Sequence, residues 1–111
     1  MARLRVEAGR DEGTTVEVIG EIVIGRDEDC DLVLHDEQVS RRHATLSELP
    51  DGSLVVTDLG SSNGTLVAGT RIEGSVELQG SVRIRIGDSV ISVEADAPRT
   101  VLAERGVTLR I

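Results

Sequence analysis

Three short motifs in the sequence contain side chains that bind anions or peptide groups, and two of them also contain glycine. In chain order they are Gly25-Arg26, Ser40-Arg41-Arg42-His43 and Ser61-Ser62-Asn63-Gly64-Thr65. The planar guanidinium of arginine binds phosphate oxygens through paired, charge-assisted hydrogen bonds, and serine offers a hydroxyl and a backbone N–H as further donors. The asparagine amide has one donor end and one acceptor end, which suits the C=O and N–H of a peptide main chain.

The composition of the chain excludes several other kinds of site. There is no Phe, Tyr or Trp, so the chain has neither an aromatic cage for methylated lysine nor a stacking platform for bases. All 12 basic residues are arginine, which excludes a lysine nucleophile, a Schiff-base lysine and a phosphate-loop lysine. The formal net charge of −8 argues against general binding to nucleic acid or to anionic membranes. Any bound anion must therefore be held by a local group of arginines.

The single cysteine, Cys30, excludes an intramolecular disulfide and a multi-thiolate metal site, and its apolar neighbours predict a small buried side chain. Residues 1–8 lack the apolar run of a signal peptide, and no stretch approaches the roughly 18 residues of a transmembrane helix. We therefore expect a cytoplasmic protein without metal or cofactor. The use of arginine in place of lysine hints at a GC-rich bacterial genome.

Short apolar runs separated by turn residues predict an all-β fold. In segments such as 4–8 and 82–86, apolar side chains alternate with charged ones, which is typical of strands with one buried face. Turn signals recur about every 8 to 12 residues, and no segment before residue 96 keeps a helical period over three turns. A chain of 111 residues is long enough for one domain. Because the composition changes at 96–98, we expect a domain over 1–95 and a tail or linker over 96–111.

The order and spacing of the three motifs closely resemble those of the forkhead-associated (FHA) domain family, over about Leu4 to Glu94. Each motif alone is a weak signal, whereas all three in order, with strands between them, are a strong one. The resemblance implies a twisted antiparallel β-sandwich of about eleven strands. It also implies a non-catalytic module that binds phosphothreonine peptides in protein kinase signalling. The alternation of apolar and polar residues does not show that the three motifs meet in space. The resemblance to the FHA family implies that they do.

The resemblance also gives the motif residues their roles. Arg26, Ser40 and Arg41 would contact the phosphate. Asn63 would hold the peptide main chain, and Ser62 would assist in the pocket. Three further residues would shape the loops, the histidine by bracing them and the glycines by permitting turns: Gly25, His43 and Gly64.

The implied partner is a protein or peptide that carries phosphothreonine, produced by a serine/threonine kinase. The tail offers one candidate ligand of its own, since Thr100, if phosphorylated, would be captured in cis or by a neighbouring copy. The sequence leaves open whether the chain is a standalone protein or the N-terminal domain of a longer one.

Taken singly, the motif residues have simpler interpretations. Arg26 alone would be a surface ion-pair partner of neighbouring carboxylates, and Asn63-Gly64 alone would be a common turn. The segment 60–64 also fits the G-x-S-x-G pattern of hydrolases, but a strand is expected after it and both histidines precede Ser62. The main alternative function is a scaffold of the same fold that makes phosphate-independent protein contacts or self-associates through an edge strand.

Overall fold

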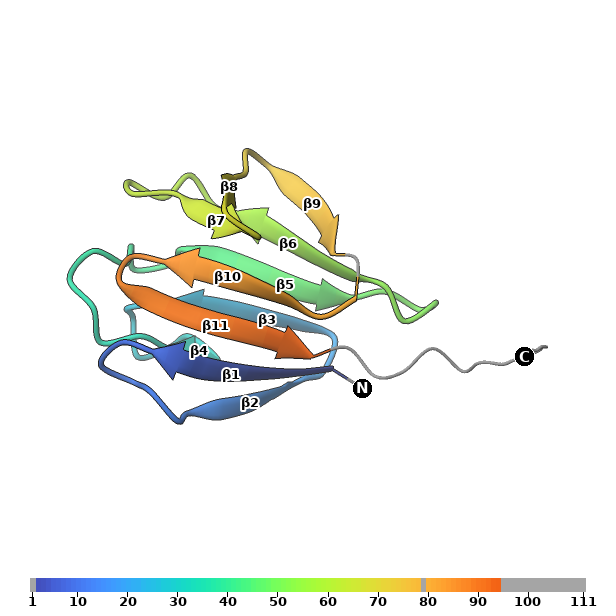
Figure 1. Ribbon diagram of the computed structural model, residues 1–111, viewed down its shortest axis with the longest axis horizontal. Coiled ribbons are helices and arrows are strands. Elements are labelled where there is room, and N and C mark those ends of the chain that lie inside the picture. Colours follow the sequence, from blue (N-terminus) through green and yellow to red (C-terminus); the bar gives the residue numbers. More distant parts are fainter. Residues whose placement is uncertain (1, 79, 95–111) are drawn as a thin grey trace.

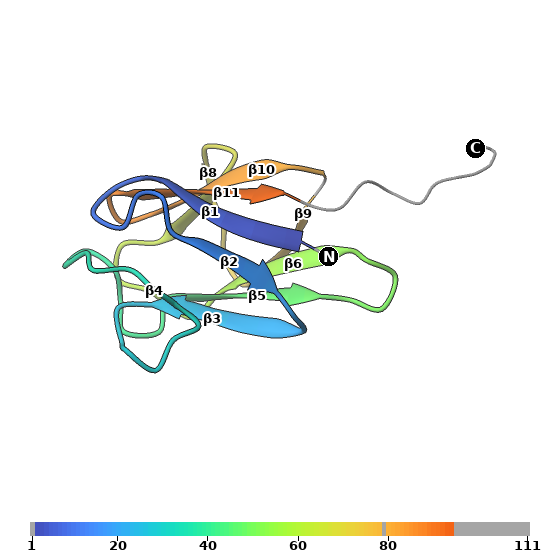
Figure 2. The ribbon, with the colours of Figure 1, turned by 90° about the horizontal axis from the view of Figure 1, so that it is seen from below.

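Two β-sheets packed face to face form a sandwich in the computed structural model, which describes residues 2–78 and 80–94 (Figures 1 and 2). One sheet has six strands in the order β2-β1-β11-β10-β7-β8, and the other has five in the order β4-β3-β5-β6-β9. The predicted all-β sandwich of about eleven strands is confirmed. The strand bounds are β1 Ala2–Ala8, β2 Thr15–Val18, β3 Glu21–Gly25, β4 Leu32–Val33, β5 Ala44–Glu48, β6 Leu54–Asp58, β7 Thr65–Val67, β8 Thr70–Arg71, β9 Ser75–Leu78, β10 Val82–Ile86 and β11 Ser89–Glu94.

One pair of neighbouring strands departs from the antiparallel pattern. β3 and β4 run parallel, with Ile24 opposite Leu32, whereas the other strand pairs are antiparallel. The connection 26–31 causes this, because it returns the chain to the level of Ile24 before β4 begins. β4 then runs in the same direction as the last residues of β3. β4 has only two residues and lies at the edge of its sheet.

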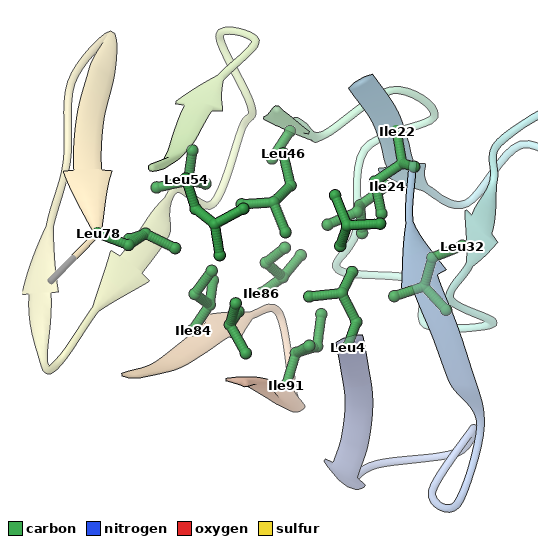
Figure 3. Packing of buried hydrophobic residues seen from close by; sticks show 14 of the residues in the cluster. Leu4, Ile22, Ile24, Leu32, Leu46, Leu54, Leu78, Ile84, Ile86 and Ile91 are labelled. Carbon is green, nitrogen blue, oxygen red and sulfur yellow. The ribbon is translucent and has the colours of Figure 1, made fainter. Parts of the chain in front are cut away.

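The core between the two sheets is aliphatic. In β1 and β11 every second residue is buried, as expected for strands that have one face on the other sheet. Figure 3 shows leucine and isoleucine side chains from both sheets meeting in this layer. The fully buried leucines and isoleucines are Leu4, Ile24, Leu32, Leu34, Leu46, Ile84, Ile86 and Ile91. This packed layer fixes the strand ends from which the connections leave.

The register of three neighbouring strands brings the three motifs to one end of the sandwich. Ala44 at the start of β5 pairs with Ile24 near the end of β3, and also with Asp58 at the end of β6. The connections that carry the motifs therefore leave or enter at the same end, on the left in Figure 1. We call this the loop end, formed by the connections 26–31, 34–43 and 59–64. The start of β1 and the end of β11 lie at the opposite end (Figure 1).

Residues 95–111 lie outside the described part of the chain. The expected tail or linker and Thr100 fall in this segment, so the boundary near residue 95 stays a prediction. Among the residues that the structure describes, no helix is long and apolar enough to cross a membrane.

Candidate functional site

The connection that carries Arg26 lies directly against the connection that carries Ser40 and Arg41. The backbone N–H of Arg26 donates to the Ser40 carbonyl at 3.0 Å. The N–H of Asp27 donates to the Arg41 carbonyl at 3.1 Å. Gly25 permits this approach, because a Cβ at that position would overlap the Arg41 carbonyl oxygen. The first and second motifs are thus joined main chain to main chain.

The guanidinium of Arg26 is anchored through one of its nitrogens. Its Nε–H donates to the Val39 carbonyl at 3.0 Å, while the residue as a whole is exposed. Within residues 2–78 and 80–94, the ion pairs found do not include Arg26. The neighbouring Asp27 instead accepts a hydrogen bond from the N–H of Asp29. The two terminal nitrogens of Arg26 can therefore bind an external anion.

His43 is a buried link between the second and third motifs. Its side chain is fully buried. The N–H of Ser40 donates to Nδ1 at 3.1 Å, so Nδ1 is unprotonated and the ring N–H lies on Nε2. Nε2 donates to the Gly64 carbonyl at 2.9 Å. One neutral imidazole therefore ties the loop of Ser40 to the loop of Gly64.

Ser62 and Asn63 reach back to the connection between β4 and β5. The N–H of Ser62 donates to the Ser40 hydroxyl oxygen at 3.2 Å. Nδ2 of Asn63 donates to the Gln38 carbonyl at 2.8 Å. Both Ser62 and Asn63 are exposed, and within the described residues the Ser62 hydroxyl and the Asn63 amide oxygen have no hydrogen-bond partner. These two groups are thus open to a ligand.

A single carboxylate, that of Asp58, fixes the shape of the third motif. It accepts hydrogen bonds from the Ser61 hydroxyl at 2.6 Å and the Thr65 hydroxyl at 2.8 Å. The N–H groups of Gly60 and Ser61 also donate to it. Partial burial acts to raise the pKa of Asp58, but these hydrogen bonds outweigh it and the pKa lies below the ordinary value. The turn before Gly64 is therefore built around a charged aspartate.

The structure brings together all five residues that were expected to contact a ligand. Arg26 and Ser40 belong to contacting connections, and Ser62 hydrogen-bonds to Ser40. Arg41 and Asn63 are exposed in the same group of loops. The convergence follows from the strand register, which the sequence pattern alone does not specify.

Sequence reasoning missed Arg71, whose side chain lies across the third motif. Gly64 has a φ of +87°, and a Cβ built on it would come 2.6 Å from Nε of Arg71. Gly64 is therefore needed both for its backbone conformation and for this close approach. No sequence signal marks the contact, because it depends on the pairing of β7 with β8, which puts Leu66 opposite Arg71.

Two further connections brace the loop end. The carboxylate of Asp11, between β1 and β2, contacts the N–H and Nδ1 of His35 at 2.6 Å each. Asp36 accepts a hydrogen bond from the N–H of Asp88, between β10 and β11, at 2.7 Å. These connections border an open polar pocket of about 270 Å³ lined by Arg10, His35, Asp36, Glu37, Gln38 and Asp88.

Cys30 packs beneath the second motif. The thiol donates to the Arg41 carbonyl at 3.2 Å, and burial raises its pKa above the ordinary value. The thiol is therefore protonated and inert, in keeping with the expected buried side chain. Within the described residues, no group of three or more His, Cys, Asp or Glu side chains is arranged to hold a metal ion.

The three motifs lie within the segment that matches a known domain family. The sequence profile of the FHA domain matches residues 22–87. The chain belongs to the FHA domain family. FHA domains are phosphopeptide-binding modules of kinase signalling complexes, and as binding modules they are generally non-catalytic.

Curated relatives of this FHA domain are longer proteins. FhaB of Mycolicibacterium smegmatis is 42% identical over 73 residues, which cover 65% of this chain and 46% of FhaB. The transcriptional regulatory protein EmbR of Mycobacterium tuberculosis is 39% identical over 74 residues, which cover 67% of this chain and 19% of EmbR. The chain thus spans less than half the length of these relatives.

Solved FHA domains share the fold. The FHA domain of CT664 from Chlamydia trachomatis is 30% identical with a TM-score of 0.78, covering 86% of this chain and 98% of that one. EmbR of Mycobacterium tuberculosis, solved with a low-affinity phosphopeptide, is 33% identical with a TM-score of 0.75 over 90% of this chain and 26% of EmbR. The FhaA FHA domain, solved with the intracellular domain of Rv3910, is 32% identical with a TM-score of 0.75 over 85% of this chain and 100% of that one.

Proposed function

We propose that this FHA domain binds peptides that carry phosphothreonine, without catalysing a reaction on them, as a module of protein kinase signalling in the bacterial cytoplasm. Arg26, Ser40 and Arg41 would hold the phosphate, with help from Ser62. Asn63 would hold the peptide main chain. The γ-methyl group of threonine would fill a small pocket beside the phosphate, so phosphoserine peptides would bind less tightly.

The observation that carries this proposal is the main-chain contact at the loop end that places Arg26 beside Ser40 and Arg41. Among the described residues, the terminal nitrogens of Arg26 take part in no hydrogen bond or ion pair, and Arg41 is exposed. A phosphate dianion suits such a pair, because charge-assisted hydrogen bonds from arginine are short and strong. The connection 26–31 carries four acidic residues and the chain as a whole a net charge of −8, so these arginines would hold the phosphate by direct hydrogen bonds and not through a positive overall field.

Similar proteins support the class of ligand. EmbR was solved with a phosphopeptide, and another FHA structure, 29% identical with a TM-score of 0.74, comes from work on phosphothreonine-dependent FHA domain interactions. By analogy with these proteins, the proposed partner is a protein that a serine/threonine kinase has phosphorylated on threonine. The binding domain would comprise residues 1–95, and residues 96–111 would be a tail or linker.

The hydrogen bonds of the two histidines argue against an enzyme. His43 is bonded to Ser40 and Gly64, and His35 is bonded to Asp11. Neither imidazole hydrogen-bonds to the Ser62 hydroxyl, so the serine of the G-x-S-x-G pattern lacks the activating base of a nucleophile. The strand β7 that begins at Thr65 also differs from the helix that follows a nucleophile elbow.

Fluorescence polarisation of dye-labelled phosphothreonine peptides tests the proposal, and an extrinsic dye is needed because the chain has no Trp or Tyr. Arg26→Ala should weaken binding by one to two decades, since charge-assisted hydrogen bonds contribute roughly 1.5–3 kcal/mol each. Arg3→Ala, an exposed arginine on β1, is the matched control and should bind like the original chain. Equal binding of phosphorylated and unphosphorylated peptides would favour the phosphate-independent scaffold instead.

A further inference from the structure

A groove on the outer face of the six-stranded sheet begins beside the loop end. Its volume is about 500 Å³, and it is lined by Leu66, Ala68, Gly69, Arg83, Arg85 and Val90 among others. We call it the arginine groove. We propose that it binds the segment of the phosphorylated partner that flanks the phosphothreonine, and that the side chains which this segment presents to the sheet are acidic and apolar in turn. The proposal rests on the proposed function, because it extends the same ligand beyond the loops.

Strand register connects the arginine groove to the candidate site. Arg85 of β10 lies opposite Val90 of β11 on one side and opposite Leu66 of β7 on the other, and Leu66 in turn lies opposite Arg71 of β8. Residues that pair directly across strands share one face of a sheet, so these four form a row on the outer face. At one end of the row, the Arg71 side chain rests on Gly64, directly after Asn63. A bound peptide that leaves Asn63 would therefore meet Arg71 and then Arg85.

The charges along this path favour an acidic occupant. The residues that line the groove include two arginines and no acidic residue, although the chain has 20 acidic residues and 12 basic ones. Within the described residues, the side chains of Arg71 and Arg83 take part in no ion pair, and Arg85 donates only to the Gly87 carbonyl, at 3.3 Å. Arg5 on the same face differs, because it approaches Glu7 at 3.7 Å. The groove arginines are therefore available to carboxylates of a partner.

The row also alternates in polarity. Leu66 and Val90 are half-buried and flank the exposed Arg85, while Arg71 stands beyond Leu66. An extended segment presents every second side chain to the surface beneath it. Carboxylates placed over the arginines, with apolar side chains over Leu66 and Val90, would match both features. Exposed ion pairs are individually weak, so the gain comes from several of them together with the covered apolar area.

Extended synthetic phosphopeptides test this inference. The core probe is a nine-residue phosphothreonine peptide with alanine flanks. Two longer probes add the six residues Glu-Ala-Leu-Ala-Glu-Ala to its N-terminal or its C-terminal side, about 20 Å when extended, so that Glu and Leu alternate on one face of the added segment. Matched probes carry Lys in place of Glu. We expect one of the two acidic probes to bind about tenfold more tightly than the core probe at low salt, and the Lys probes to show no gain.

Two protein variants locate the effect. The double variant Arg83→Ala/Arg85→Ala, whose charge change equals that of the control below, should remove the tenfold gain and leave binding of the core probe unchanged, because neither residue belongs to the loops. Arg3→Glu, on the same face but on β1, should keep the gain. Thermal unfolding of each variant, followed by far-ultraviolet circular dichroism, confirms that it is folded.

The outcomes separate this inference from the proposed function. If the core probe binds in a phosphate-dependent way but neither acidic extension improves it, the arginine groove is not part of the ligand site. If Arg3→Glu abolished the tighter binding of the acidic probe to the same extent, the inference would also be overturned, since the effect would then come from the net charge of the protein and not from the groove. If the core probe fails to bind, the proposed function fails. The groove is then tested alone with an unphosphorylated Glu-Ala-Leu-Ala-Glu-Ala peptide, and the chemical-shift changes that it causes in the protein must centre on Leu66, Arg85 and Val90.

Discussion

The two ends of the sandwich are held together by different kinds of hydrogen bond. At the loop end the bonds cross between connections, as in the two bonds of His43 to Ser40 and Gly64. At the opposite end the β5–β6 hairpin is closed by its own residues, since Leu49 and Ser53 are joined main chain to main chain and Asp51 accepts from the N–H of Ser53. A self-contained hairpin keeps its shape independently, whereas the shape of the loop end is a joint property of several segments.

The largest effect is expected from His43→Ala. This change leaves the Ser40 N–H and the Gly64 carbonyl unpaired and opens a cavity, at a cost of about 2–4 kcal/mol in the free energy of unfolding. Phosphopeptide binding should be lost as well, because two connections separate. Thermal unfolding and fluorescence polarisation measure the two effects. Leu49→Ala at the exposed opposite hairpin is the control, and a similar loss there would contradict the contrast between the ends.

Asp58→Asn should have an intermediate effect. The amide keeps the size of the side chain but loses the charge that strengthens the bonds from Ser61 and Thr65, at a cost of roughly 1–2 kcal/mol. Because these bonds shape the loop of Ser62 and Asn63, the affinity for a phosphothreonine peptide should fall severalfold. Isothermal titration calorimetry gives the affinity, and unchanged binding would show that the loop holds its shape without the carboxylate.

Acid should reproduce the loss of the Asp58 bonds. The pKa of Asp58 is lowered in the folded state, so its contribution to stability is fully present above the unfolded pKa of about 3.9 and disappears as the pH falls through the lower folded pKa. The amide resonances of Gly60 and Ser61 should therefore stay constant from about pH 7 to 5 and shift only below about pH 3.9. If the resonances of Gly60 and Ser61 instead shifted with a midpoint between pH 5 and 6, the lowered pKa of Asp58 would be contradicted.

The smallest effect is expected from Asp51→Asn. Hydrogen bonds from the backbone and side chain of Ser53 lower the pKa of Asp51 as well, but this carboxylate is fully exposed and serves one hairpin. The change should leave phosphopeptide affinity unchanged and shift the unfolding temperature only slightly. A loss of affinity would show that the two ends are coupled through the sheets.

The strands and the family of this protein could be predicted from its sequence, whereas most contacts within the candidate site could not. Alternation in segments such as 82–86 predicts strands, and the order of the motifs identified the family. The partners of the motif side chains were not predictable, because Val39 and Gln38 offer backbone carbonyls, which every residue has. The parallel pairing of β4 and the approach of Arg71 to Gly64 were missed for a similar reason, since both depend on how separate segments pack.

The row of Ile24, Ala44 and Asp58 has a consequence for how such a domain can change in length. These three residues lie side by side at the strand ends where the connections of the loop end begin or finish. One residue inserted within β5 would shift the start of β5 by about 3.4 Å relative to the ends of β3 and β6, and would turn the side chains on one side of the insertion to the other face of the sheet. Insertions in the hairpin around Asp51 would leave the row intact. Length variation, or a grafted tag, is therefore best accommodated at the end away from the candidate site.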